Sequence, residues 1–270
     1  MKTAITLSLL PSSPRMPFVL GPDLEKGVAR AAELGYDAFE LFPPTIEAID
    51  TSTINRLTES YNIQLSTIGT GGGWVSQGLT LTNADPAERK RGIEYAKQMV
   101  QVAGDMGASA IIGSMQGRAG DNDRSKTLKR LGDALAELGE YSKQWEVPVF
   151  YEPLNRYETD LANTLADAAK VLEDCGADNS LLLADLFHMN IEETCVCTAL
   201  KAASNHIGHI HFIDSNRWPA GNGHTDFEAI VATLNEIGFD RYLAVEAYPL
   251  PDQDAAAVAA MDAFKKFGIC

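Results

Sequence analysis

Short apolar runs alternate with amphipathic stretches along the whole 270-residue chain. Residues 87–106 repeat apolar side chains at helical spacing, with Ile93, Met99 and Ala103 on one stripe. The apolar runs have the length of strands, and several are almost continuously apolar, which is typical of parallel strands covered on both faces. They occupy residues 3–9, 37–41, 64–68, 109–113, 148–152, 181–185, 207–213 and 242–246. The pattern predicts eight strands, each followed by a helical segment.

Four of the predicted helices end at a glycine that is followed closely by the next apolar run. These glycines are Gly35, Gly107, Gly176 and Gly238. Because glycine adopts the left-handed conformation at no steric cost, it commonly ends a helix where the chain turns back toward a sheet. Eight strand–helix units in 270 residues match the size and repeat of a (β/α)8 barrel, the TIM-barrel class of α/β fold. We therefore expect residues 1–270 to form a single barrel domain.

A doubly wound open sheet is the alternative α/β arrangement. Such a sheet usually carries a GxGxxG turn after its first strand, and the sequence has none there. The glycine-rich segment GTGGGW at 69–74 lacks that spacing, and we interpret it as a flexible loop over the site. After it, Asp85 is expected to cap the next helix, with Pro86 at the first helical position.

The composition narrows the class of protein. Hydrophobic residues make up 45% of the chain, which is enough to bury a barrel-sized core. The formal net charge of −15 argues against nucleic-acid binding, which needs clustered Lys and Arg. No apolar stretch approaches the ~20 residues that span a membrane, and we interpret the first apolar run as a strand rather than a signal peptide. The four Cys match neither a zinc pair nor a redox CxxC motif, so we expect reduced thiols in a cytoplasmic protein.

Four of the later apolar runs end in a carboxylate or an imidazole, namely Glu152, Asp185, His211 and Glu246. The carboxyl ends of barrel strands face the active site, so these side chains should gather at one side of the mouth, at strands five to eight. Ionised groups resist burial, and one divalent cation would compensate all four. Three oxygen ligands with one nitrogen suit Mn²⁺, and also Mg²⁺ or Co²⁺, better than a thiolate zinc site. Four unrelated polar caps on strand ends are the alternative.

Three segments in the second half of the chain form recognisable motifs. They are EPLNRYE at 152–158, DLFHMNIEE at 185–193 and GHIHFIDSNRWPAGNGH at 208–224, and Glu246 follows in the last strand. Together they resemble the motifs of the ketose 3-epimerases related to D-tagatose 3-epimerase, within the xylose isomerase-like barrel superfamily. The resemblance covers residues 145–250, and the first half of the chain agrees only through its strand–helix rhythm.

The resemblance implies a role for each matching residue. Glu152, Asp185, His211 and Glu246 would hold one divalent metal ion that chelates the carbonyl and the adjacent hydroxyl of a ketose. Glu152 and Glu246 would also be the catalytic acid and base on opposite faces of the sugar, acting through an enediolate. The residues expected to contact the substrate oxygens are His188, Arg217 and Glu158, with Arg156 pairing with carboxylates nearby. From the residues alone, His188 could instead cap a helix, and Arg217 could lie in a surface loop.

The region that would meet the far end of the sugar departs from the family pattern. The segment LLPSSPRMPF at 9–18 is more polar than the aromatic residues expected there, and it carries Arg15. After the fourth strand, Arg118 and Arg124 could meet a phosphate or carboxylate group, although solvated loop arginines are the alternative. The substrate could therefore be a phosphorylated or acidic sugar as well as a free ketose. Arg118 is a candidate substrate-binding residue.

The other histidines and two of the tryptophans are weaker candidates. His206 and His209 are both expected to be structural. His206 precedes the strand, and His209 has the parity of His211 but lies deeper in the barrel. His224 lies in the glycine-rich turn GNGHTDF, where Asp226 is expected to cap the next helix. Trp74 and Trp218 are expected in loops at the mouth of the barrel. They could form an apolar wall against the C–H faces of a sugar, or they could only pack against neighbouring residues.

Three other functions are compatible with such a barrel. An aldose–ketose isomerase similar to hydroxypyruvate isomerase shares the metal and the enediolate, so sequence separates it poorly from an epimerase. An endonuclease IV-like phosphodiesterase would need more than the five histidines present, and the acidic surface would repel DNA. A sugar-binding protein without catalysis would not need two carboxylates on opposite faces. The expected partner is a small-molecule sugar, with neither nucleic acid nor membrane, and an assembly of identical chains stays open.

Overall fold

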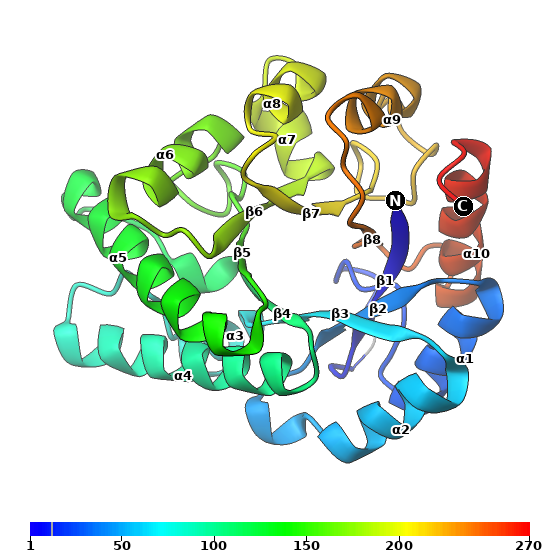
Figure 1. Cartoon of the computed structure of the whole chain (residues 1–270), viewed down its shortest axis with the longest axis horizontal. Helices are drawn as coiled ribbons and strands as arrows, with labels where there is room; N and C mark the ends of the chain where they lie inside the picture. Colours follow the sequence, from blue (N-terminus) through cyan, green and yellow to red (C-terminus); the bar gives the residue numbers. More distant parts are fainter. Residues whose placement is uncertain (12) are drawn as a thin grey trace.

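The computed structural model describes residues 1–11 and 13–270 of the chain. Its parallel strands close into a barrel in the order β1-β2-β3-β4-β5-β6-β7-β8 (Figure 1). The prediction of a (β/α)8 barrel is therefore confirmed, and each predicted apolar run overlaps an observed strand. The strands are β1 (Lys2–Ser8), β2 (Ala38–Phe42), β3 (Gln64–Gly69), β4 (Ser109–Ile112), β5 (Val149–Tyr151), β6 (Ser180–Asp185), β7 (Ile207–His211) and β8 (Tyr242–Val245).

The helices surround the barrel and cover its outer face (Figure 1). Within the described residues, none of them is both long enough and apolar enough to cross a membrane. Three short 3-10 helices lie at Ile46–Ala48, Ser114–Gln116 and Lys143–Trp145. The α helices are α1 (Leu24–Leu34), α2 (Thr51–Tyr61), α3 (Gly71–Gln77), α4 (Pro86–Asp105), α5 (Arg124–Ser142), α6 (Leu165–Cys175), α7 (Leu186–Glu192), α8 (Val196–Ala202), α9 (Phe227–Glu236) and α10 (Gln253–Lys266).

Several helix ends follow the signals in the sequence. Asp85 accepts hydrogen bonds from the first backbone N–H groups of α4, which Pro86 opens, and Asp226 caps α9 in the same way. Gly35 and Gly176 end α1 and α6 in the left-handed conformation, with φ of 90° and 64°. Because these ends are fixed locally, the short connections that follow deliver each strand to the barrel in register.

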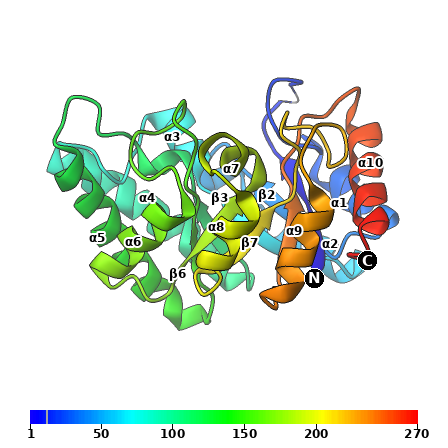
Figure 2. The same cartoon turned by 90° about the horizontal axis from the view of Figure 1, so that it is seen from above.

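The segment at 69–74 differs from the prediction of a flexible loop. Gly69 ends β3, and the helix α3 begins two residues later at Gly71. A Cβ atom on Gly72 would lie 2.4 Å from the carbonyl oxygen of Pro43 and 2.6 Å from that of Pro44. Gly72 therefore lets α3 pack closely against neighbouring backbone, and this role differs from that of a glycine that makes a loop flexible. In Figure 2, α3 and α7 lie toward the upper end of the barrel, away from the N-terminal end of β1.

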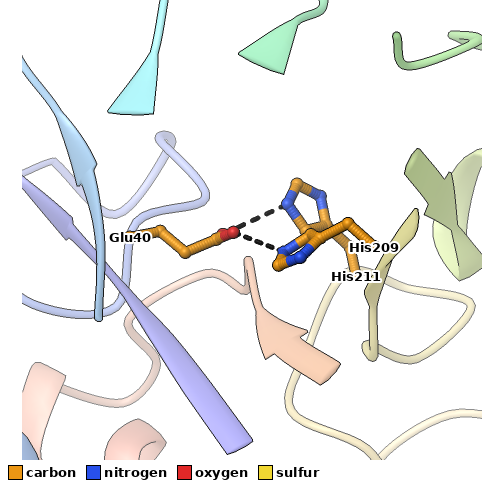
Figure 3. A group of neighbouring side chains, drawn as sticks. All are labelled: Glu40, His209 and His211. Carbon is orange, nitrogen blue, oxygen red and sulfur yellow. Dashed lines mark ion pairs between the residues drawn. The ribbon is translucent and has the colours of Figure 1, made fainter. Parts of the chain in front are cut away.

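The barrel interior combines small residues with a few large ones. Ala4, Ala38 and Ala244 pack together on β1, β2 and β8, and Ile111, Phe150 and Leu183 form a second apolar group on β4, β5 and β6. Side chains alternate between the two faces of a strand. Glu40 therefore shares the inward parity of Ala38, and it points across the barrel toward His209 and His211 on β7 (Figure 3).

Candidate metal centre and active site

The four side chains that close the apolar runs lie together at the carboxyl ends of neighbouring strands. Asp185 and His211 are the last residues of β6 and β7, and Glu152 and Glu246 follow β5 and β8 by one residue. All four are buried, and one ligand atom from each lies within 4.8 Å of the others. Nδ1 of His211 is 3.0 Å from Oδ2 of Asp185, 3.5 Å from Oε1 of Glu152 and 3.8 Å from Oε2 of Glu246.

The chemistry of this cluster fits a divalent cation. Three largely buried carboxylates converge here, and like charges repel strongly where little water screens them. Oε1 of Glu152 is buried and has no hydrogen-bond donor among the described residues, so it has a free lone pair for a ligand. Three hard oxygen donors with one imidazole nitrogen are the ligand set of oxygen-preferring metals such as Mn²⁺ and Mg²⁺.

Burial and neighbouring charges shift the pKa values within the metal-free cluster. Burial raises the pKa of Glu152 to about 8, and the carboxylates of Glu246 and Asp185 add to the shift. Burial also acts on Asp185, but His188 and His211 outweigh it and lower the pKa of Asp185. Burial would lower the pKa of His211, yet the surrounding carboxylates outweigh it and raise that pKa well above its usual value. The cluster therefore holds protons that a cation would replace.

His188 lies buried in the first turn of α7, beside the four candidate ligands. The backbone N–H of Asn155 donates to its Nδ1 at 3.3 Å, and Nδ2 of the same asparagine is 2.7 Å away. Since Nδ1 accepts, the proton of the neutral ring is on Nε2. Burial lowers the pKa of His188, which keeps the ring neutral. Nε2 lies 3.8 Å from Oε1 of Glu152 and has no hydrogen-bond partner among the described residues, so it can donate to a ligand.

Arg217 reaches the cluster from the loop that follows β7. Its guanidinium pairs with Oε2 of Glu246, lies 3.8 Å from Oε1 of Glu158 and stacks 4.8 Å from the ring centre of Phe187. The side chain is only 12% exposed, so the surface-loop alternative does not hold. Its φ of 62° is uncommon for a residue other than glycine and is typical of a functional constraint. Asp214 holds this loop by accepting hydrogen bonds from the backbone N–H groups of Ser215, Gly221, Gly223 and Thr225.

The cluster opens into a cavity of about 200 Å³ with one polar and one apolar wall. The polar wall contains Glu152, Glu158, His188, Arg217 and Glu246. The lining also contains a group of apolar side chains, called the apolar wall below, namely Leu10, Met16, Phe18, Phe42 and Val75.

Residues 9–18 contribute to the apolar wall. Phe18 and Phe42 contact each other, with ring centres 4.5 Å apart. Arg15 is exposed and is absent from the described lining of the cavity. Although the segment is rich in polar residues, Leu10, Met16 and Phe18 line the cavity. Ser12 lies outside the described residues.

The three arginines considered for the site take separate positions. Arg118 lies outside the cavity, in a neighbouring depression beside Trp74, and donates to the backbone carbonyls of Tyr157 and Glu158. Arg124 donates to the carbonyls of residues 160 and 161. Arg156 pairs with Glu192 at 2.8 Å, which ties the loop after β5 to α7. All three hold the loop that carries Glu158, and binding of an anionic substrate by Arg118 stays a prediction.

The remaining candidates lie away from the cavity. His206 pairs with Glu173 at 3.0 Å, and His224 is exposed. Trp74 and Trp218 are both absent from the described lining, so the apolar wall consists of other residues. His209 is buried inside the barrel below His211, as expected from its parity.

Two residues near the ligands were missed by the sequence analysis. Glu40 is fully buried on β2, and its carboxylate contacts both His209 and His211 (Figure 3). The available signal was a lone glutamate inside the apolar run AFELF. Gly113 follows β4, and a Cβ atom on it would lie 2.7 Å from Oε2 of Glu152. No sequence signal distinguishes this glycine from a turn residue, because the close approach joins two separate strands.

Comparisons with known proteins identify the family of the chain. The family described as xylose isomerase-like TIM barrel matches residues 28–267. An L-ribulose 3-epimerase from Mesorhizobium japonicum is 31% identical over 84% of this chain and 76% of the relative. A 3-dehydro-D-guloside 4-epimerase from Escherichia coli is 26% identical over 79% of this chain and 83% of the relative. A solved structure of an L-ribulose 3-epimerase superposes with a TM-score of 0.82 at 26% identity, covering 99% of this chain and 94% of that one. The chain therefore belongs to the xylose isomerase-like TIM-barrel family.

Proposed function

We propose that the protein is a divalent-metal-dependent ketose 3-epimerase that acts on an uncharged keto sugar. The observation that carries this proposal is the cluster of Glu152 and Glu246 with Asp185 and His211, in which the two glutamates line one cavity. Relatives that are named epimerases, which include enzymes of L-ribulose and of 3-dehydro-D-gulosides, support the reaction class.

Glu152, Asp185, His211 and Glu246 would hold the cation, and we propose Mn²⁺. When bound, it would polarise the substrate carbonyl and stabilise the enediolate oxygen that forms as the neighbouring proton leaves. The donor set is compatible with Mg²⁺ and Co²⁺ as well, and Mn²⁺ is preferred because it accepts imidazole more readily than Mg²⁺ does.

Glu152 and Glu246 are the proposed catalytic pair. Inversion of a carbon next to a carbonyl needs a base that removes the proton on one face and an acid that returns one on the other. Both side chains line the cavity, and their two environments differ. Glu246 is held by Arg217, whereas Oε1 of Glu152 has no donor among the residues described. Burial raises the pKa of both glutamates, which is the direction that suits proton exchange near neutral pH.

Three polar residues beside the pair are proposed to bind the substrate oxygens. Nε2 of His188 has no hydrogen-bond partner among the described residues and lies 3.8 Å from Oε1 of Glu152, so its N–H can donate to a substrate oxygen near that carboxylate. Arg217 lies between Glu246 and Glu158, so its guanidinium can meet a hydroxyl or carbonyl oxygen at the same end of the sugar. The apolar wall with Phe18 and Phe42 would then face the carbon atoms at the other end.

An uncharged substrate is preferred over a phosphorylated one. Among the described residues that line the cavity, the basic side chains are His188 and Arg217. His188 is kept neutral by burial, and Arg217 is already paired with two carboxylates. The proposed cation is already offset by three carboxylate ligands, so a phosphate group in this cavity would lack a basic side chain to balance it, which is costly at low dielectric.

The test is proton exchange with solvent. The purified protein is incubated in D₂O with Mn²⁺ and with a panel of free ketoses, ketose phosphates and keto acids, and the products are followed by NMR. We expect deuterium at C3 of a free ketose, together with the C3 epimer. Deuterium at C1 and formation of an aldose would instead identify an aldose–ketose isomerase, and exchange confined to the phosphates would contradict the uncharged substrate. A cytoplasmic location stays a prediction from the cysteine pattern.

A further inference from the structure

Glu40 is an unusual residue for the middle of a barrel. Its side chain is fully buried on β2, one layer below the cavity, and it is absent from the described lining. A buried carboxylate is costly unless its oxygens have partners. Here Oε1 accepts a hydrogen bond from Oγ1 of Thr67 at 2.7 Å and lies 2.5 Å from Nε2 of His209, and Oε2 lies 3.2 Å from Nε2 of His211. Each carboxylate oxygen therefore lies within ion-pair distance of an imidazole nitrogen, although Oε2 accepts no hydrogen bond from the described residues (Figure 3).

His211 connects this carboxylate to the candidate ligands. Its Nε2 faces Glu40, whereas its Nδ1 faces Asp185, Glu152 and Glu246 at 3.0 to 3.8 Å. In the metal-free cluster both ring nitrogens face a carboxylate oxygen, with Nδ1 3.0 Å from Oδ2 of Asp185 and Nε2 3.2 Å from Oε2 of Glu40. When a cation takes the lone pair of Nδ1, the one proton of the neutral ring must be on Nε2, where it faces Glu40. The lone pair is then on Nδ1, which is the nitrogen among the three candidate carboxylate ligands.

His209 fixes the carboxylate from the other side. Its ring stacks on Phe150, with centres 5.3 Å apart and planes inclined by 25°, and meets the edge of the His211 ring at 5.9 Å. This packing holds Nε2 of His209 against Oε1 of Glu40. The contact restrains the Glu40 carboxylate from rotating away from His211. A second cation among these three residues is disfavoured, because the 2.5 Å between Nε2 and Oε1 is shorter than the roughly 3.3 Å between ligand atoms around one tetrahedral ion.

We propose, on the basis of the proposed metal site, that Glu40 is a positioning residue for that site. Its carboxylate holds His211 in the tautomer that presents Nδ1 to the cation and raises the basicity of that ring, and His209 keeps the carboxylate in place. A carboxylate behind a ligating histidine is a general way to strengthen a metal site, and its loss typically weakens metal binding by about 10–100-fold. Glu40 touches no substrate, so it acts through His211 alone.

The experiment measures Mn²⁺ binding by EPR of the free ion, with wild type, Glu40→Gln and a matched control, Ser66→Ala. Ser66 lies on the next strand and donates to the backbone carbonyl of Phe39 at 3.1 Å, so its loss removes a buried hydrogen bond beside Glu40 without touching the cluster. We expect one Mn²⁺ per wild-type chain, a dissociation constant about 10–100-fold higher in Glu40→Gln, and no change in Ser66→Ala. Thermal unfolding of the metal-free variants checks that both fold.

Each outcome separates this inference from the metal proposal itself. Wild-type affinity in a folded Glu40→Gln variant would overturn the role of Glu40, and so would two Mn²⁺ per wild-type chain. Absence of binding by the wild type would instead overturn the metal site. If Glu40→Gln does not fold, long-range ¹H–¹⁵N spectra of the Mg²⁺-loaded wild type decide the question. They should show a proton on Nε2 of His211, and a proton on Nδ1 would refute the assignment.

Discussion

Binding of the metal should release protons, and the number released should fall as the pH rises. Burial raises the pKa of Glu152 to about 8 in the metal-free cluster, so this carboxyl is mainly protonated at pH 7. Burial opposes protonation of His211, but the charges of Glu40 and Glu246 outweigh it and raise the pKa of His211 well above its usual value. A carboxyl group and an imidazolium must both lose a proton before they can bind a cation. Higher pH removes these protons beforehand, so it strengthens metal binding.

The size of the effect follows from the pKa of Glu152. A group with a pKa of about 8 is about nine-tenths protonated at pH 7 and about one-tenth protonated at pH 9. This carboxyl should therefore release about 0.9 proton per cation at pH 7 and about 0.1 at pH 9. Its contribution alone makes the apparent affinity rise by about tenfold per pH unit below pH 8 and level off above it. His211 adds up to one further proton over the range in which it is charged.

Isothermal titration with Mn²⁺ in two buffers of different ionisation enthalpy counts the protons directly. Glu152→Gln should release about one proton fewer than wild type at pH 7, because the amide carries no titratable proton. Glu192→Gln is the matched control, since Glu192 pairs with Arg156 and its pKa is already lowered. An affinity that does not change between pH 6 and pH 8 in the wild type would show that the cluster is already deprotonated, and the reasoning would fail.

Three further results are expected from the proposed site. His211→Ala should lose Mn²⁺ in a metal assay of purified protein, because the remaining carboxylates lack the nitrogen ligand, and full occupancy would contradict the four-ligand site. Glu152→Gln and Glu246→Gln should each lower net epimerisation by about 10²–10⁴-fold, and one of them should still exchange one epimer's proton with D₂O. Full activity in either would assign proton transfer to another group. Arg118→Ala should leave KM for an uncharged ketose unchanged. A KM that rises only for sugar phosphates or sugar acids would instead support an anionic substrate.

The sequence by itself determined the barrel and the four candidate ligands, because both follow from local rules. A strand that is covered on both faces must be apolar along its length, so each strand is visible as a run of residues. A candidate ligand at its carboxyl end interrupts that run with a charge, as Asp185 does after LLLA and Glu246 does after YLAV. Once eight such units close into a barrel, residues one unit apart must become neighbours at its mouth. The cap at Asp85 was predictable for the same reason, since a helix start depends on adjacent residues.

Only the tertiary structure decided the features that depend on distances between separate elements. Glu40 acquires its partners across the barrel, from β2 to β7, so nothing near it in the sequence indicates His209 or His211. Gly72 in α3 packs closely against the backbone of Pro43 and Pro44, which come from a separate segment of the chain. The apolar wall exists because residues 9–18 turn Phe18 inward beside Phe42. Local patterns fix which residues form strands and which end them as candidate ligands, whereas contacts between remote strands and loops fix which atoms face the cavity.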